Sequence, residues 1–238
     1  MSAGSMLPLT LEAVCFEAGG ERHIHHISHR FSHGPRTVIL GPNGAGKSLL
    51  LRLCHGLITP SAGAVRWAAR TSRRQAMLFQ TPVMLRRSAA ANIAYALAIN
   101  GVPRAARAAR VDEALARVGL EALARRPARA LSVGEQQRLA LTRAWAIDPE
   151  VLFLDEPTAS LDPAATRAIE QAIDDVHNSG AKIIMTTHDL AQARRLADEV
   201  LFLHHGRLLE AGAADMFFSR PKSREAAAFP TRTGRAPR

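Results

Sequence analysis

The pattern of apolar and polar positions predicts strands and helices that alternate along most of the chain. Strands over Leu7–Phe16 and Ile24–Phe31, joined by a turn at Gly19-Gly20, precede a short buried strand over Val38–Leu40. Alternation of this kind predicts an α/β fold with a mostly parallel sheet, helices on both faces and an N-terminal antiparallel β part. Further strands are predicted over Ala64–Trp67, Ala76–Phe79, Val151–Leu154, Lys182–Thr187, Val200–Leu203 and Arg207–Glu210, and helices over Gly46–His55, from Ser132, over Asp162–Gly180 and over Leu190–Ala197.

One long stretch departs from this alternation. Between Ser88 and Arg129 the sequence is rich in alanine and arginine, and Pro103 suits the first turn of a helix there. We therefore expect a helical subdomain over about residues 81–150, inserted into a main domain that covers residues 1–219. Residues 220–238 contain three prolines and six basic side chains and are predicted to be a disordered tail.

A phosphate-binding loop is predicted between the third strand and the first helix. Its sequence matches the pattern G-x-x-x-x-G-K-[S/T] in full, with the flanking elements that the pattern requires. The glycines let the backbone wrap around an anion, and the following helix adds the positive end of its dipole. The lysine would neutralise outer phosphates, and the serine would offer its hydroxyl to Mg²⁺. The loop consists of Gly41, Pro42, Asn43, Gly44, Ala45, Gly46, Lys47 and Ser48.

The net charge of +10 lies in two segments, which limits what it implies. Residues 86–129 hold nine arginines against three acidic residues, and residues 220–238 hold six basic residues against one acidic residue. Tyr95 is the only aromatic residue in the first segment, which argues against a track that stacks single-stranded nucleic acid. We interpret this segment as a solvated helix face and expect no nucleic-acid partner.

Composition otherwise indicates a globular cytosolic protein. No apolar run approaches the roughly 20 residues that span a bilayer, and no secretory signal precedes the first strand. Cys15 and Cys54 lie on separate elements, which predicts reduced, partly buried thiols. Five histidines fall within residues 23–33 without Cys or acidic residues placed among them, which favours an exposed edge strand over a metal site.

Acidic residues follow the most hydrophobic predicted strand. Val151–Leu154 ends in Asp155 and Glu156, the pattern of a central parallel strand that delivers carboxylates at its carboxyl edge. Upstream of them, Ser132 and Glu135 form the S-x-x-E pattern of a helix capping box. Taken alone, that pattern indicates a good helix start.

Five motifs follow the phosphate loop along the chain, and their order is similar to that in one known protein family. They are Gln80 after a strand, Leu-Ser-Val-Gly-Glu from Leu131, Leu-Phe-Leu-Asp-Glu-Pro from Leu152, the Ser160–Asp162 segment and the Thr187–Asp189 strand end. Over about residues 7–219, this set resembles the ATPase subunit of ATP-binding-cassette (ABC) transporters. The resemblance implies a P-loop NTPase core, ATP and Mg²⁺ as ligands, and ATP hydrolysis as the activity.

The resemblance also implies a role for each motif. The phosphate loop would bind the phosphates of ATP, and Asp155 would hold Mg²⁺ together with Ser48 and Gln80. Glu156 would polarise the attacking water, a task that suits a carboxylate beside the terminal phosphate. His188 would touch the γ-phosphate.

In the family that the chain resembles, the site is completed by a second copy of the subunit. Ser132 and Gly134 would contact the γ-phosphate of ATP held by that copy, and Asp162 would lie in the loop that crosses to it. The resemblance therefore implies a homodimer of ATPase subunits at the cytoplasmic face of the inner membrane. It also implies an integral membrane permease and, indirectly, an extracytoplasmic solute-binding protein.

Three positions depart from the family pattern. The motif Leu131–Glu135 stands in the place of the family's signature motif, which usually has glycine and glutamine where this chain has Val133 and Glu135. Because a β-branched residue tolerates positive φ badly, the loop must either hold a negative φ at Val133 or carry strain. Glu135 adds a negative charge near the γ-phosphate of the other copy unless the capping box turns it back to the backbone. Ala18 stands where an aromatic ring usually stacks on adenine, and Phe16, two residues earlier, is the candidate replacement.

The chain is most similar to the separate ATPase subunits of bacterial importers. The stretches Leu51–Ile58, Phe79–Arg87 and Thr186–Glu199 resemble tungstate-type oxyanion importers, which transport tungstate or molybdate, with importers of phosphate or polar amino acids as alternatives. A cassette ATPase that acts on nucleic acid or ribosomes is the alternative from another class. A small-molecule kinase is disfavoured by the signature and by Glu156.

The residues that follow Gln80 have two interpretations. Val83, Met84 and Leu85 either form the surface that receives a membrane partner or belong to the buried core.

Overall fold

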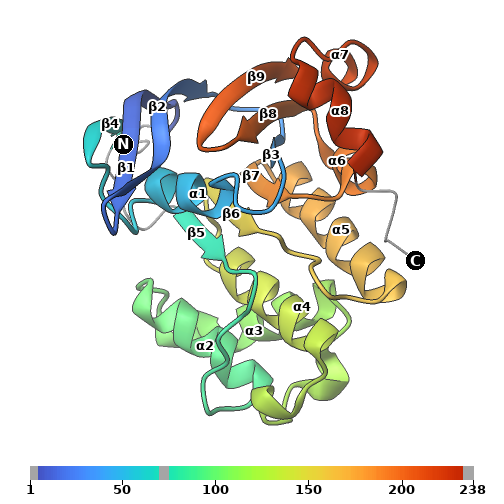
Figure 1. Cartoon of the computed structure of the whole chain (residues 1–238). Coiled ribbons are helices and arrows are strands. Elements are labelled where there is room, and N and C mark those ends of the chain that lie inside the picture. Colours follow the sequence, from blue (N-terminus) through green and yellow to red (C-terminus); the bar gives the residue numbers. More distant parts are fainter. Residues whose placement is uncertain (1–4, 70–74, 233–238) are drawn as a thin grey trace. The chain divides into compact units, whose positions relative to one another are not determined.

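The computed structural model describes residues 5–69 and 75–232, and these fall into two compact units (Figure 1). The first unit lies within Met1–Thr71 and Lys182–Arg238, and the second lies within Ser72–Ala181. Among the described helices, none has both the length and the apolar character needed to cross a bilayer.

The first unit begins with a three-stranded antiparallel sheet in the order β2-β1-β4. These strands are β1 (Leu9–Ala18), β2 (Glu21–Phe31) and β4 (Ala62–Trp67), and a turn at Gly19-Gly20 joins the first two, as predicted. The histidine-rich segment forms most of β2, an outer strand of this sheet. Cys15 and Cys54 are both buried and free of disulfides.

A mostly parallel sheet supplies the core of the first unit. In it β3 (Thr37–Leu40) lies between β7 (Lys182–Thr187) and β8 (Glu199–His204), and β9 (Arg207–Ala213) adds antiparallel to β8. Every residue of β3 and β7 is buried, which explains their nearly continuous apolar sequences. Lys182 of β7 is charged and yet buried. Its Nζ donates to the Thr37 hydroxyl at 2.8 Å, and burial lowers its pKa to about 8.

Helices complete the described part of the first unit. α1 (Lys47–His55) ends at Gly56, whose φ of 86° makes it the predicted glycine cap. α6 (Leu190–Leu196) and α7 (Ala214–Ser219) follow β7 and β9.

The prediction of a disordered tail is wrong for residues 224–232, which form α8 (Arg224–Arg232). The basic and proline residues suggested disorder, but Ala226 and Phe229 are spaced to share one helix face and are buried. The rings of Phe229 and Phe202 lie 5.4 Å apart. Residues 233–238 lie outside the described part of the chain.

The second unit pairs two parallel strands with a group of helices. The strands are β5 (Gln75–Leu78) and β6 (Val151–Asp155). The predicted helical stretch is present, and on α5 (Pro163–Asn178) the predicted apolar face of Ile169, Ile173 and Val176 is fully buried. The helices are α2 (Ala89–Ile99), α3 (Arg104–Arg117), the short 3₁₀ helices η1 (Glu121–Leu123) and η2 (Ala128–Ala130), α4 (Val133–Trp145) and α5 (Pro163–Asn178).

Candidate functional site

The predicted phosphate loop connects β3 to α1, so it lies at the carboxyl end of a buried strand. α1 begins at Lys47, and Gly46 is its N-cap, so no cap side chain accepts hydrogen bonds from the first turn. Gly46 has a left-handed φ of 96°, and a Cβ there would lie 2.8 Å from Cδ1 of Ile24. The left-handed backbone conformation therefore favours glycine at this position, and a Cβ would also require the Ile24 side chain to shift.

Lys47 lies along the loop. Its side chain is buried, and Nζ donates to the carbonyl oxygens of Gly41 at 2.9 Å and Pro42 at 3.1 Å. The first turn of α1 contains no acidic residue. A buried cation next to a helix start that lacks a side-chain cap is an environment that stabilises an anion, and it fits the phosphates of a nucleotide.

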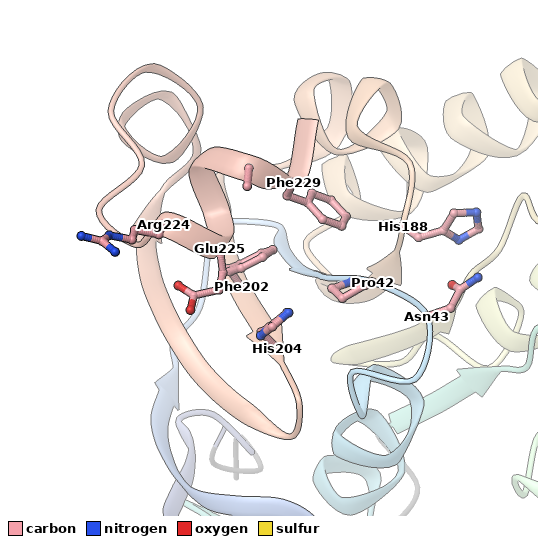
Figure 2. A pocket seen from close by; sticks show the side chains of 9 residues that line it. Pro42, Asn43, His188, Phe202, His204, Arg224, Glu225 and Phe229 are labelled. Atoms are coloured by element: carbon pink, nitrogen blue, oxygen red, sulfur yellow. The ribbon is translucent and has the colours of Figure 1, made fainter. Parts of the chain in front are cut away.

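His188 lies at the same edge of the first unit as the phosphate loop. The last residue of β3 pairs with Thr187 in a parallel register, so the loop and His188 leave the sheet together. Asp189 caps α6, which fixes the turn that carries His188. Pro42, Asn43 and His188 line one cavity (Figure 2).

In the second unit, Gln80 and the two acidic residues gather at one strand edge. β5 and β6 are parallel, with Leu78 paired to Leu154, so Gln80 and Glu156 each follow the paired residues by two positions. Asp155 ends β6 and is 2% exposed. Glu156 has a positive φ of 45°, a strained conformation that costs on the order of 1–3 kcal/mol and is typical of functional sites.

The start of α4 carries the complete capping box predicted from the sequence. The backbone N–H of Ser132 donates to Glu135 Oε2 at 2.7 Å, and the N–H of Glu135 donates to Ser132 Oγ at 3.3 Å. The pKa of the Glu135 carboxyl is lowered because the backbone N–H of Ser132, and also its hydroxyl at 2.9 Å, donate to Oε2. Val133 opens the helix without a positive φ, which is the unstrained one of the two alternatives, and its side chain is 63% exposed.

Gly134 places the start of α4 beside the start of α5. A Cβ at Gly134 would lie 3.0 Å from the Cβ of Ala165, in the first turn of α5. Asp162 is the N-cap of α5, and its carboxylate accepts a hydrogen bond from the N–H of Ala165 at 2.8 Å. The second unit therefore brings Ser132, Gly134 and Asp162 to two neighbouring helix starts.

Gln137 is a functional candidate that the sequence did not indicate. It lies on the buried face of α4, and its Nε2 donates to the carbonyl oxygen of Pro157 at 2.8 Å. This bond ties the helix that carries the signature to the turn directly after Glu156. A glutamine among apolar positions of a helix was the only signal available.

The segment formed by residues 83–85, called here the Val83 segment, is held by arginine side chains. Arg143 donates to the carbonyl oxygen of Val83 at 3.0 Å, and Arg129 donates to that of Met84 at 3.2 Å. The side chain of Val83 is 69% exposed, whereas Met84 is 4% exposed. Met84 therefore belongs to the core, whereas Val83 is exposed and its place in a partner surface stays a prediction.

The region predicted to contact adenine contains a histidine close to Ala18. Ala18 is exposed at the end of β1, and Phe16 is half-buried. His23 Nε2 lies 3.3 Å from the carbonyl oxygen of Ala18. Across the described residues, His, Cys, Asp and Glu side chains nowhere gather in a group of three that could hold a metal ion.

Comparison with known proteins places these features in one family. The family described as "ABC transporter" matches residues 24–159, which include the phosphate loop, Gln80, the start of α4 and Glu156. The chain belongs to the ABC transporter family. As a member of this family it is an ATPase, and ATP is its nucleotide.

Two curated relatives from this family resemble the chain over most of its length. The tungstate uptake system ATP-binding protein TupC of Peptoclostridium acidaminophilum is 42% identical over 205 residues, which cover 84% of this chain and 94% of that protein. The phosphate import ATP-binding protein PstB 2 of Natronomonas pharaonis is 35% identical, with 93% of this chain and 85% of that protein covered.

A solved structure supports the same fold. The structure of cbiO1 from Clostridium perfringens, described as part of the ABC transporter complex cbiONQ, superposes with a TM-score of 0.80 at 28% identity. The match covers 97% of this chain and 98% of that one. The predicted fold class, a P-loop ABC ATPase core with an antiparallel β part and added helices, is therefore confirmed.

Proposed function

We propose that this chain is the ATP-hydrolysing subunit of a bacterial ABC importer for an oxyanion such as tungstate or molybdate. The observation that carries this proposal is the 42% identity to a tungstate uptake protein across 94% of that protein's length. Importers of phosphate and of amino acids remain the second candidates, because a phosphate import protein is 35% identical and a methionine import protein is 37% identical.

The phosphate loop and the metal ligands would prepare ATP for attack. Lys47 neutralises the outer phosphates from its place along the loop. The hydroxyl of Ser48, the amide oxygen of Gln80 and the carboxylate of Asp155 are the oxygen donors that suit Mg²⁺. When bound, Mg²⁺ supplies charge neutralisation at the phosphate oxygens.

Glu156 and His188 would act on the reaction itself. Glu156 orients and polarises the water that attacks the γ-phosphate, and the strained backbone at this residue supports a functional role. His188 donates a hydrogen bond to the γ-phosphate as charge develops on it. Gln137 is a positioning residue, because its hydrogen bond to Pro157 holds the turn that follows Glu156.

A second copy of the chain would complete each site. Ser132 and Gly134 of one copy contact the γ-phosphate of ATP held by the other, with Asp162 in the crossing loop. The neighbouring starts of α4 and α5 support this arrangement, because they bring Ser132, Gly134 and Asp162 close together. One copy alone would then hydrolyse ATP slowly.

The Val83 segment would receive the permease at the cytoplasmic face of the inner membrane. The exposed apolar side chain of Val83 suits a protein interface, and two arginines fix the backbone that carries it. Phe79, Tyr95 and Ile99 of the same unit are also exposed, at 38%, 40% and 61%. A solute-binding protein would act on the permease from the other side of the membrane.

Co-purification tests this proposal. The wild-type chain, expressed in its own cells, should retain an integral membrane protein in mild detergent, and Val83→Asp should lose it while keeping ATPase activity in solution. The matched control is Leu57→Asp, another exposed apolar residue, 48% exposed and in the first unit, which should keep the partner. Retention by both variants would reject the Val83 segment as the contact, and no membrane partner in any sample would reject the importer.

A further inference from the structure

The first unit contains a cavity that is lined by residues of the phosphate loop and also by residues of β8 and α8, which have no role in the proposed function. Its volume is 480 Å³, within the range of about 300–1,000 Å³ typical of small-molecule sites. It lies where β3, β7 and β8 end, the edge at which parallel sheets of α/β proteins bind ligands. α8 forms the opposite wall.

The middle of the cavity is apolar and aromatic. Phe202 of β8 and Phe229 of α8 meet edge to face, with ring centroids 5.4 Å apart, and Pro42 lies across from them (Figure 2). The imidazole of His204 is stacked with Phe202 at an interplanar angle of 13°. Flat ring surfaces of this kind favour a planar aromatic ligand.

The two ends of the cavity are polar. Asn43 and His188 lie at one end, and Arg224 and Glu225 of the first turn of α8 lie at the other (Figure 2). Arg224 and Glu225 have opposite charges, so this end does not favour a highly charged ligand. An amide and an imidazole at the first end suit a single hydrogen-bonding group.

Buried side chains and hydrogen bonds hold α8 in place as one wall of the cavity. Phe229 and Ala226 are 7% and 3% exposed, and the N–H of Ala226 donates to Ser223 Oγ at 3.1 Å. Ser223 in turn donates its own N–H to the carboxylate of Glu210 on β9. The cavity is therefore bounded by fixed elements on both sides.

We propose that this cavity binds a planar aromatic molecule of low net charge, and that its occupancy changes the affinity of the phosphate loop for ATP. Pro42 and Asn43 belong to both sites, so a ligand in the cavity contacts the loop that holds ATP. Coupling between two sites is reciprocal, and typical values correspond to about 5- to 150-fold changes in affinity. This effector site goes beyond the proposed transport function and does not depend on the solute.

The experiment uses the full chain and the fluorescent aromatic probe anilinonaphthalene sulfonate. Ala228 lines the cavity from α8, and Ala227 is its exposed neighbour on the same helix. Ala228→Phe should fill the cavity and weaken probe binding at least about tenfold, whereas Ala227→Phe should bind the probe like the wild type. Ala227→Phe should also leave ATPase activity without probe unchanged, since Ala227 does not line the cavity.

Linkage is then measured in both directions. ATP should shift the dissociation constant of the probe by about fivefold or more, and the probe should shift that of ATP by the same factor. Equal probe binding by the two variants would overturn the site. The coupling would be overturned if only Ala228→Phe loses probe binding but the probe leaves the affinity of the wild type for ATP unchanged.

Discussion

The starts of α1 and α4 are both proposed to bind phosphate, yet they are built in opposite ways. At α1 the N-cap is a glycine, the first turn contains no acidic residue, and the buried Lys47 lies along the loop. At α4 the N-cap is Ser132, and the carboxylate of Glu135 in the first turn already accepts its backbone N–H. One helix start has a positive charge in place of a cap, and the other is capped by its own acid.

This difference implies an order of events. The start of α1 stabilises an anion without help, so a single copy should bind ATP there. A phosphate at the start of α4 must share its surroundings with the negative charge of Glu135. We therefore expect α4 to engage only ATP that another copy already holds, so ATP binding precedes dimerisation.

Of the changes at the two helix starts, removal of the charge at α1 should have the largest effect. Lys47→Ala should weaken ATP binding by about 10- to 150-fold, the equivalent of a hydrogen bond to a charged group. Lys222→Ala, an exposed lysine in the same unit, is the control and should bind ATP like the wild type. Titration with a fluorescent ATP analogue measures both, and a loss smaller than twofold in Lys47→Ala would contradict the role of α1.

Ser132→Ala removes the N-cap hydroxyl at the start of α4. It should leave ATP binding to one copy unchanged but reduce hydrolysis at saturating ATP by about tenfold, because a contact to the terminal phosphate is lost. The cap itself contributes about 1 kcal/mol of stability. Ser88→Ala removes a comparable N-cap from α2, so it should lower the melting temperature similarly and keep full hydrolysis. Equal hydrolysis in the two variants would mean that Ser132 is only a cap.

Glu135→Gln sharpens the contrast. Glutamine can keep the capping box, and the negative charge near the proposed phosphate disappears. ATP-dependent dimerisation should strengthen by about two- to fivefold, the size of a helix-terminus charge effect. Glu121→Gln, an exposed acidic residue in the first turn of η1, is the control. Weaker dimerisation in Glu135→Gln would show that the carboxylate itself is needed.

The smallest difference should be that between ATP and GTP in the wild type, because both helix starts are proposed to contact phosphates alone. With alanine at position 18, GTP should compete with ATP within a few-fold. Ala18→Tyr should add a stacking contact that contributes about 1–3 kcal/mol. Competition titrations of both nucleotides measure this, and a preference for ATP above about fifty-fold in the wild type would show that another group, such as Phe16 or His23, reads adenine.

Local chemistry explains what the sequence could predict. The phosphate loop, the glycine cap at Gly56 and the capping box at Ser132 each depend on a few adjacent residues, and all three are present. The buried strands were predicted equally well, because parallel strands covered on both faces need continuous apolar sequence.

Features that depend on tertiary packing were harder to predict. Basic and proline residues concealed α8, whose Phe229 needs Phe202 of a distant strand as its partner. Met84 could not be assigned to the core, nor Gln137 to the turn after Glu156, because both depend on contacts between separate helices and loops. The positive φ of Glu156 likewise has no signal in the sequence.

The central claim is that ATP joins two copies through the starts of α1 and α4, and Glu156→Gln tests it most directly. This variant should bind ATP normally and hydrolyse it about 10²–10⁴ times more slowly, the usual contribution of a positioned general base. Its molar mass is measured by light scattering with and without ATP and Mg²⁺. We expect a dimer with ATP and a monomer without it. A monomer that has ATP bound would show that ATP does not join two copies.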